Sequence, residues 1–476
     1  MEYKKTKIVA TLGPATSSKD TLEEIIKAGV DVCRINFSHG SHDEYAQVIR
    51  DIRQINDEQG RNVAILADLQ GPKIRIGELE EKEVILVNGA KIEIFSNQKF
   101  KGTAERLSVN YDDFARDLKS GEKILIDDGK LVLEVLQAFP KEHKVVAKVL
   151  SGGSLTPKKG VNLPNTKLSL PSLTEKDLKD LQFALDQKLE WVALSFVRTA
   201  RDIIELKYII SEQGGGARVI AKIEKPEAVQ NIEEIIKEVD GLMVARGDLG
   251  VELPMEEVPL IQKRLVKISL RHAKPVIIAT QMMESMIQHY RPTRAEVNDV
   301  ANAVMDGADA VMLSAETSVG KYPVLVVENM AKIIRQIEIS GEDYNYEFPP
   351  KGGEERFVTD SICFSATKLA QRVDAKGIIT MTHSGYTAFK ISSFRPTSII
   401  FVFSSNREIL NMLSLVWGVK AFYYDKFVST DHTIADIKYI LTKNGFVQTG
   451  DFIVHVASMP IKDKGQVNMI KLSQVD

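Results

Sequence analysis

The chain has 476 residues, too many for a single hydrophobic core, and this length favours about three domains. A hydrophobic content of 44% is ordinary for a globular protein, and 62 basic against 65 acidic residues leave a net charge of only -3. This balance gives no electrostatic reason to expect a nucleic acid or an anionic membrane as a partner. No segment approaches the roughly 18 to 20 apolar residues of a membrane span.

The first residues, MEYKKTKIVATLG, place lysines before an apolar run and so resemble a signal peptide superficially. The run is short and lacks a small-residue cleavage pattern, so it predicts a first strand instead. The two cysteines, Cys33 and Cys363, lie far apart in sequence and each sits in an apolar run. We expect reduced core thiols in a cytoplasmic protein.

Strand-like runs alternate with helical patterns in two blocks. The first block has KIVATLG, VDVCRINF and VAILADL, and the second has WVALSFV, RVIAKIE, GLMVARGD, KPVIIAT and GADAVMLSAE. Eight strands, each paired with a helix, predict an α/β fold of the (β/α)8 TIM barrel type, whose active site lies at the C-terminal strand ends. One helix start is well marked, because Thr293 and Glu296 fit a capping box ahead of an apolar stripe at Val297, Val300, Ala301 and Val304.

Between the two blocks the sequence changes to short runs in which apolar and polar residues alternate. DDG at Asp127 to Gly129 is a hairpin signal. This predicts an all-β insert at the barrel mouth that could act as a lid. After the polar stretch EFPPKGGEER, four strand-like runs and a final run, NMIKLSQV, predict a separate C-terminal α/β domain. The expected domains are a catalytic barrel at 1–69 and 170–343, an all-β lid at 70–169, and an α/β domain at 344–476.

Charged residues close two of the predicted strands. Lys222 and Glu224 are two apart and point to the same face, and Asp248 closes the next strand. Ionised groups are costly to bury without partners, so this set predicts a divalent metal and an anion, and Lys222 suits a transferring phosphoryl group. Gly247 lies where backbone N–H groups can meet an anion near a helix start. The alternative is a set of buried salt bridges.

Other strand ends add groups of the same kind. RINFSHG places Arg34, Asn36 and Ser38 on one face and continues to His39, a set that suits a phosphate, although Arg34 could instead pair with a barrel carboxylate. ADLQGPKIR supplies Asp68, Lys73 and Arg75, and the two cations could also form a solvated surface pair. The seventh strand supplies Thr280 and Gln281, and the eighth supplies Ser314 and Glu316; the methionines at 282, 283 and 286 are expected in the core.

In the C-terminal domain, TMTHSGYT passes from a strand into a predicted helix. Its hydroxyl and glycine residues could hold a phosphate without net charge, or Ser and Thr could simply cap the helix. The residues concerned are Thr382, His383, Ser384, Gly385 and Thr387.

Taken together, RINFSHG, DLQGPKIR, AKIE, MVARGDLG, ATQMMESM and PTRAEVNDVANAVMDGADAVMLSAET resemble pyruvate kinase, in order and over the whole chain. The resemblance is to bacterial members and implies transfer of the phosphoryl group of phosphoenolpyruvate to ADP, giving pyruvate and ATP. It also implies a barrel, a β-barrel lid, a C-terminal α/β domain and usually a homotetramer.

The resemblance also implies residue roles. Arg34 would hold the phosphate, Lys222 would stabilise it in flight, and Glu224 and Asp248 would bind Mg2+ or Mn2+. Gly247, Asp248 and Thr280 would seat the carboxylate end of the substrate, with Thr280 near the enolate carbon. The positions associated with the nucleotide are matched by Asn36, His39, Arg75 and Lys159.

One position departs from the common pattern. Many pyruvate kinases hold K+ with oxygens at positions matching Asn36, Ser38 and Asp68, together with a nearby Glu, and Lys73 stands where that Glu would be. A tethered ammonium can take the place of a free monovalent cation, so we expect activity without K+, as in the K+-independent members that the segment resembles.

The loop from Thr382 to Thr387 resembles the sugar-phosphate loop of the family, and MPIKDKGQ lacks the Trp and Arg of some fructose 1,6-bisphosphate responders. A monophosphate effector such as ribose 5-phosphate, AMP or a hexose phosphate is expected. Two other functions stay open at this point: a metal-dependent aldolase or lyase acting on pyruvate-type enolates, and a non-catalytic barrel scaffold.

Overall fold

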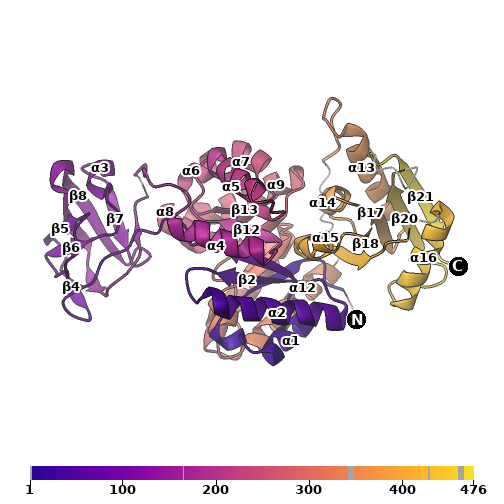
Figure 1. The fold of residues 1–476 in the computed structure, drawn as a ribbon, viewed down its shortest axis with the longest axis horizontal. Coiled ribbons are helices and arrows are strands. Elements are labelled where there is room, and N and C mark those ends of the chain that lie inside the picture. The colour runs from indigo at the N-terminus through magenta and orange to yellow at the C-terminus, as the bar shows by residue number, and fades with distance from the viewer. Residues whose placement is uncertain (1–2, 165, 341–347, 427–428, 459–465) are drawn as a thin grey trace.

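The computed structural model describes residues 3–164, 166–340, 348–426, 429–458 and 466–476. Three parts follow one another along the long axis in Figure 1, with the insert at one end, a barrel in the middle and the C-terminal domain at the other end. Among the described residues, none of the helices is long and apolar enough to cross a membrane.

Eight parallel strands close into a barrel in the order β1-β16-β15-β14-β13-β12-β3-β2, which confirms the predicted (β/α)8 fold. Each strand is short and almost fully buried, and most of its polar residues lie near its ends. The strands are β1 (Lys7–Thr11), β2 (Val32–Asn36), β3 (Ala64–Asp68), β12 (Trp191–Leu194), β13 (Arg218–Ile223), β14 (Gly241–Ala245), β15 (Val276–Ala279) and β16 (Ala310–Leu313).

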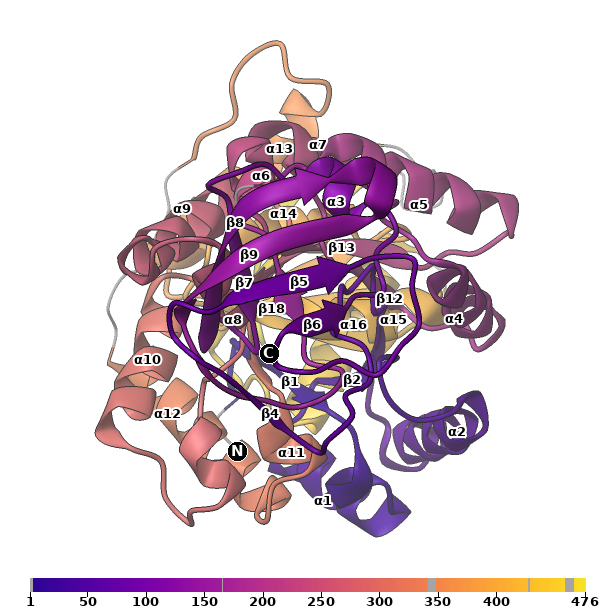
Figure 2. The ribbon, with the colours of Figure 1, turned by 90° about the vertical axis from the view of Figure 1, so that its left-hand side faces the viewer.

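Helices surround the barrel and bury one apolar face each against it (Figure 2). The predicted capping box begins α10, where the side chains of Thr293 and Glu296 each bind the other's backbone. The predicted apolar stripe is wrong at one position. Val297 is exposed, whereas Val300, Ala301 and Val304 are buried. The helices are α1 (Lys19–Ala28), α2 (His42–Gln59), α4 (Glu175–Asp186), α5 (Ala200–Glu212), α6 (Pro226–Gln230), α7 (Ile232–Glu238), α8 (Arg246–Glu252), α9 (Val258–Arg271), α10 (Arg294–Met305), α11 (Ala315–Ser318) and α12 (Pro323–Ile339).

The insert leaves the barrel after β3, returns before α4 and is all-β apart from the short α3 (Phe114–Asp117), as predicted. The DDG turn joins two antiparallel strands, β7 and β8. A six-stranded sheet has the order β11-β7-β8-β9-β5-β6, and single bridges from Arg75 to Gly160 and from Ile76 to Val109 link its two edges into a ring. The strands are β4 (Val84–Leu86), β5 (Lys91–Phe95), β6 (Arg106–Ser108), β7 (Lys123–Ile126), β8 (Leu131–Phe139), β9 (Lys144–Ser151), β10 (Gly153–Leu155) and β11 (Val161–Asn162).

The C-terminal domain is a five-stranded sheet in the order β19-β18-β17-β20-β21, with only β21 antiparallel. It packs on the N-terminal ends of the barrel strands, where the Trp191 indole donates to the Met412 carbonyl at 3.1 Å. The predicted loop MPIKDKGQ falls almost wholly outside the described residues. The elements are α13 (Phe357–Arg372), β17 (Gly377–Met381), α14 (Tyr386–Ser393), β18 (Ile399–Ser404), α15 (Arg407–Met412), β19 (Val419–Tyr423), α16 (Thr430–Lys443), β20 (Phe452–Ala457) and β21 (Met469–Gln474).

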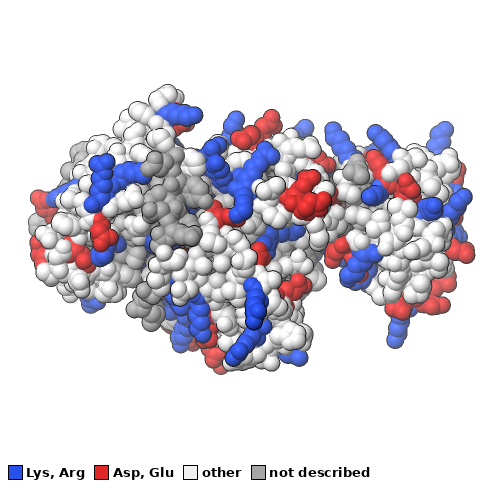
Figure 3. All heavy atoms as spheres, turned by 180° about the vertical axis from the view of Figure 1, so that it is seen from behind, with Lys and Arg blue, Asp and Glu red and all other residues white. Residues whose placement is uncertain are grey.

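Both cysteines are buried free thiols, as expected, and burial raises the pKa of each to about 12. Met282, Met283 and Met286 are also buried, which confirms their predicted place in the core. On the face seen in Figure 3, basic and acidic side chains are interspersed over all three parts, in keeping with the small net charge.

Candidate active site

Arg34 and Lys222 meet the buried carboxylates of Asp68 and Glu224 at the C-terminal ends of three barrel strands. The Arg34 Nε donates to Asp68 Oδ2 at 2.6 Å, and the Lys222 Nζ lies 3.1 Å from Asp68 Oδ1 and 3.0 Å from Glu224 Oε1. Arg34 also donates from Nη1 to the Thr11 hydroxyl at 2.8 Å. The structure therefore brings together four residues that the sequence analysis placed on three different strands.

Burial and charge act against each other in this cluster. Burial alone would lower the pKa of Lys222, but Asp68 and Glu224 outweigh it and hold the pKa above the usual lysine value. Burial alone would raise the pKa of Asp68, but Lys222 and Arg34 lower it below its ordinary value. For Glu224 burial prevails over Lys222, and the charge of Asp248 adds to it, so the pKa is raised. Lys222 thus stays cationic at neutral pH.

Ser195 belongs to this cluster, although no pattern in the sequence singled it out. Its hydroxyl accepts from Lys222 Nζ at 2.7 Å and donates to the Leu69 carbonyl at 2.7 Å, at the start of the connection to the insert. The next residue, Phe196, donates its N–H to Glu224 Oε2 at 2.9 Å. The loop after β12 therefore orients both members of the Lys222–Glu224 pair.

Gly247 and Thr280 form a second group on the neighbouring strand ends. The Gly247 N–H donates to Thr280 Oγ1 at 2.8 Å, and that hydroxyl donates to the Ala279 carbonyl at 2.6 Å. Thr280 has a φ of 70°, a left-handed conformation that costs energy for a β-branched residue. Strain of this kind persists only where the surroundings hold it, and here Arg246 does so.

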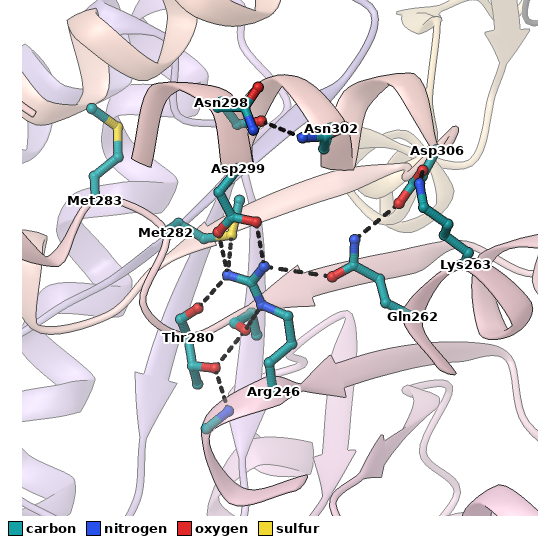
Figure 4. A network of polar contacts seen from close by, with 12 residues as sticks. Arg246, Gln262, Lys263, Thr280, Met282, Met283, Asn298, Asp299, Asn302 and Asp306 are labelled. Atoms are coloured by element: carbon teal, nitrogen blue, oxygen red, sulfur yellow. Dashed lines mark hydrogen bonds and ion pairs between the residues drawn. The ribbon is translucent and has the colours of Figure 1, made fainter. Parts of the chain in front are cut away.

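Arg246 lies at the centre of the polar network in Figure 4. Its Nη1 and Nη2 each lie 2.7 Å from one carboxylate oxygen of Asp299, and Nη2 also donates to the Thr280 carbonyl at 2.7 Å. Gln262 accepts from the same guanidinium at 3.5 Å and donates to Asp306 at 3.0 Å. The sequence by itself assigned no role to Arg246. In the structure its guanidinium holds the backbone of Thr280.

We expect Arg246→Lys to lower kcat/KM roughly 10- to 100-fold, because an ammonium cannot bind Asp299 through two nitrogens while holding the Thr280 carbonyl. Steady-state kinetics with the protein's Tm measured in parallel would show this loss. Lys263→Ala, which removes an exposed cation that pairs with Asp306 in the same network, is the matched control. Wild-type kcat/KM in Arg246→Lys would contradict this role.

The residues matched to the nucleotide lie apart from the buried cluster. Lys159 Nζ pairs with Asp127 at 2.8 Å, and Arg75 donates to the Lys158 carbonyl at 3.1 Å, both within the insert. Asn36 Oδ1 accepts the Ser38 N–H at 3.1 Å, and His39 is exposed. Asn36 and His39 thus lie at the C-terminal end of β2, whereas Arg75 and Lys159 lie in the insert.

Lys73 does not join the Asp68 cluster in this structure. Among the described residues the ion-pair partners of Asp68 are Arg34 and Lys222, and the Lys73 side chain lies beside Gly160 of the insert. It lines a small cavity at the root of the insert together with Phe196 and Arg198. The chain's path into the insert, which the sequence could not give, sets this position.

Glu224 and Asp248 are the two carboxylates predicted to bind a divalent ion. Among the residues that the structure describes, no cluster of three or more His, Cys, Asp or Glu side chains forms a complete metal cage. Two carboxylates fit Mg2+ nonetheless, because Mg2+ usually keeps water and binds one or two carboxylates plus substrate phosphates. The charge of Asp248 contributes to the raised pKa of Glu224, so the two carboxylates are close enough to interact.

The residues of the predicted effector loop lie at the start of α14, with His383 and Ser384 exposed. Gly385 has a φ of 84° and donates its N–H to Thr382 Oγ1 at 2.9 Å, and Thr387 is buried. Arg218, the first residue of β13, donates to the Ser384 carbonyl at 3.0 Å. The loop therefore touches the barrel strand whose other end carries Lys222.

Comparison with known proteins accounts for nearly the whole chain. Residues 3–327 match the family model of the pyruvate kinase barrel domain, and residues 360–473 match that of its alpha/beta domain. The chain belongs to the pyruvate kinase family. It is 43% identical to the pyruvate kinase of Corynebacterium efficiens, over 98% of this chain and 97% of that protein. It is 42% identical to the enzyme of Geobacillus stearothermophilus, over 98% and 80% respectively.

The fold agrees with this membership. A crystal structure of a pyruvate kinase from Cryptosporidium parvum matches with a TM-score of 0.93 and 35% identity, covering 99% of this chain and 96% of that one. The family and function predicted from the sequence are thus confirmed, and the aldolase and scaffold alternatives lose their support.

Proposed function

We propose that the barrel mouth transfers the phosphoryl group of phosphoenolpyruvate to ADP, giving pyruvate and ATP, through the residues predicted from the sequence. The observation that carries this proposal is the buried cluster of Arg34, Asp68, Lys222 and Glu224. Phosphoryl transfer needs charge neutralisation and alignment more than covalent chemistry, and this cluster supplies fixed charges of both signs in a dry site.

Arg34 would bind the phosphate. Asp68 and Thr11 hold its Nε and Nη1, and among the described residues Nη2 has no hydrogen-bond partner, so one edge of the guanidinium can meet an anion. Lys222 would stabilise the phosphoryl group in flight, since its charge is secured by two carboxylates. Gly247, Asp248 and Thr280 would seat the carboxylate end of phosphoenolpyruvate, with the Thr280 hydroxyl facing the enolate carbon.

Glu224 and Asp248 would hold Mg2+ or Mn2+. The ion would neutralise charge developing on the oxygens of the substrate. For the nucleotide, Asn36, His39, Arg75 and Lys159 are proposed as the binding groups. Lys159 and Arg75 now bind partners inside the insert, so ADP must replace those contacts.

A lactate dehydrogenase-coupled assay with phosphoenolpyruvate, ADP and Mg2+ tests the proposal. Pyruvate must appear in equal amount with ATP. An aldolase or lyase would release pyruvate without needing ADP, and a scaffold would give neither product. Pyruvate formation independent of ADP would therefore contradict phosphoryl transfer.

We further propose that the enzyme does not require K+. Lys73 stands at the position of the usual Glu, and only a change in its side-chain conformation or in the insert could bring its ammonium to Asp68. The expected result is full activity in an assay free of K+, Na+ and NH4+, whereas Lys73→Glu should need added K+. A several-fold rise in the wild-type rate on adding K+ would contradict this proposal.

The loop of Thr382, His383, Ser384, Gly385 and Thr387 is proposed to bind a monophosphate effector such as ribose 5-phosphate, AMP or a hexose phosphate. We expect one of these to shift the phosphoenolpyruvate saturation curve to lower concentration, and Ser384→Asp to abolish the shift by repulsion. Ser405→Asp, at an exposed serine of the same domain, is the control. An unchanged saturation curve with all three compounds would remove the proposal.

The remaining proposals concern organisation. We propose a homotetramer in the cytoplasm, with domains at 1–69 and 170–343, 70–169 and 344–476, and with the insert acting as a lid. The boundary at 343–344 lies outside the described residues. Two buried free thiols support a reducing compartment.

A further inference from the structure

The insert makes a small polar contact with the barrel close to its root. Asn162, on β11, donates from Nδ2 to Glu252 Oε1 at 2.8 Å, and Lys225 Nζ lies 2.6 Å from the same oxygen. Lys225 and Glu252 are both buried. Within the described part of the chain, this is the only hydrogen bond between a strand of the insert and a barrel residue.

The partner of Asn162 belongs to the helix that carries the substrate site. Glu252 is the last residue of α8, whose first turn holds Gly247 and Asp248. At ~1.5 Å per residue, Glu252 lies roughly 6 Å along the helix from Asp248. The turn between β7 and β8 approaches the same helix end, because a Cβ built on Gly129 would lie 4.0 Å from Val251 Cγ1. The insert therefore contacts the last turn of α8 at two places, through Asn162 and near Gly129.

Asn162 also sits beside both connections of the insert. Its neighbour Val161 donates an N–H to the Ile74 carbonyl in the outgoing connection at 2.9 Å. The returning connection is held by Arg198, which donates to the Leu168 and Leu170 carbonyls at 2.8 and 2.6 Å. A contact next to the hinge moves little when the far strands swing, so it can persist while the insert closes.

The two cations proposed to bind ADP, Lys159 and Arg75, lie next to the segment that Asn162 anchors. Lys159 precedes it by three residues, and Arg75 forms a β-bridge with Gly160. We propose that Asn162 and Glu252 form a pivot that fixes the root of the insert on α8 and thereby sets the position of Lys159 and Arg75 for ADP. Both are positioning residues, and this inference rests on the proposed nucleotide-binding role of the two cations.

Asn162→Ala tests the pivot with little risk to folding, because Lys225 and Glu252 keep each other as partners. The lost bond has a charged acceptor, so we expect the KM for ADP to rise roughly tenfold. The kcat and the KM for phosphoenolpyruvate should stay within about twofold. Gln137→Ala, which removes an exposed amide from β8 of the insert, is the matched control. Asn162→Gln keeps the donor group and should restore part of the ADP affinity.

A merely structural role would lower the active fraction, and hence kcat, without changing either KM. An unchanged KM for ADP in Asn162→Ala would overturn the proposal, provided that Lys159→Ala raises it. If Lys159→Ala also leaves the KM for ADP unchanged, the nucleotide assignment has failed. Amide hydrogen exchange of the ligand-free protein then tests whether Asn162 and Glu252 form a pivot. We expect faster exchange at residues 249–252 and 161–162 in Asn162→Ala, and wild-type exchange there would overturn the pivot.

Discussion

Replacing Lys222 with methionine should lower kcat roughly 10³-fold or more while changing the KM for phosphoenolpyruvate much less. The ammonium lies between Asp68 and Glu224 and is the group proposed to offset charge on the phosphoryl group during transfer. Methionine has a similar length but no charge, so it removes the electrostatic contribution with the smallest change in packing. Single-turnover measurements would separate the chemical step from product release.

The same substitution has a predicted electrostatic signature. Lys222 favours the charged form of both carboxylates against the effect of burial. Its loss should therefore raise the pKa of Asp68 from its lowered value and raise the pKa of Glu224 further. The pH dependence of divalent-ion binding should then move to higher pH, because the protonated carboxyl persists to higher pH. Lys27→Met, at an exposed lysine of α1, is the control. A kcat within tenfold of wild type in Lys222→Met would contradict the assigned role.

Replacing Trp191 with alanine should lower the free energy of unfolding by about 3–5 kcal/mol. Trp191 is fully buried at the N-terminal end of β12, and its indole N–H donates to the Met412 carbonyl of the C-terminal domain. Truncation leaves a cavity between barrel and C-terminal domain and an unpaired buried carbonyl. Chemical denaturation followed by circular dichroism measures the loss as a lower midpoint.

Two variants bracket this result. Trp191→Phe retains much of the apolar volume and should lose less, whereas Tyr439→Ala removes an aromatic ring that is already 66% exposed and should change the midpoint little. Trp417 is the remaining tryptophan in Trp191→Ala and packs against Lys5 and Arg395 at the same junction. Its fluorescence should therefore report whether the domains separate before the barrel unfolds. A midpoint equal to that of Tyr439→Ala would show that the junction contributes little to stability.

The sequence by itself determined which groups meet at the barrel mouth. Buried parallel strands confine charge to their ends, and the closed barrel brings those ends to one rim, so Arg34, Lys222 and Glu224 could be placed together from their spacing alone. The capping box of α10 and the DDG hairpin could also be predicted from the sequence, because each depends on a few neighbouring residues. Family motifs then supplied the reaction.

Only the tertiary structure decided contacts between elements distant in sequence. Nothing in the spacing shows that Arg246 holds the Thr280 carbonyl or that Ser195 joins Lys222 to the start of the insert. The exposure of Val297 and the place of Lys73 beside Gly160 depend on how helices pack and where the insert leads the chain. The Asn162–Glu252 contact is of the same kind, because the relative position of two domains follows from their shared surface and hinge rather than from the residue pattern of either one.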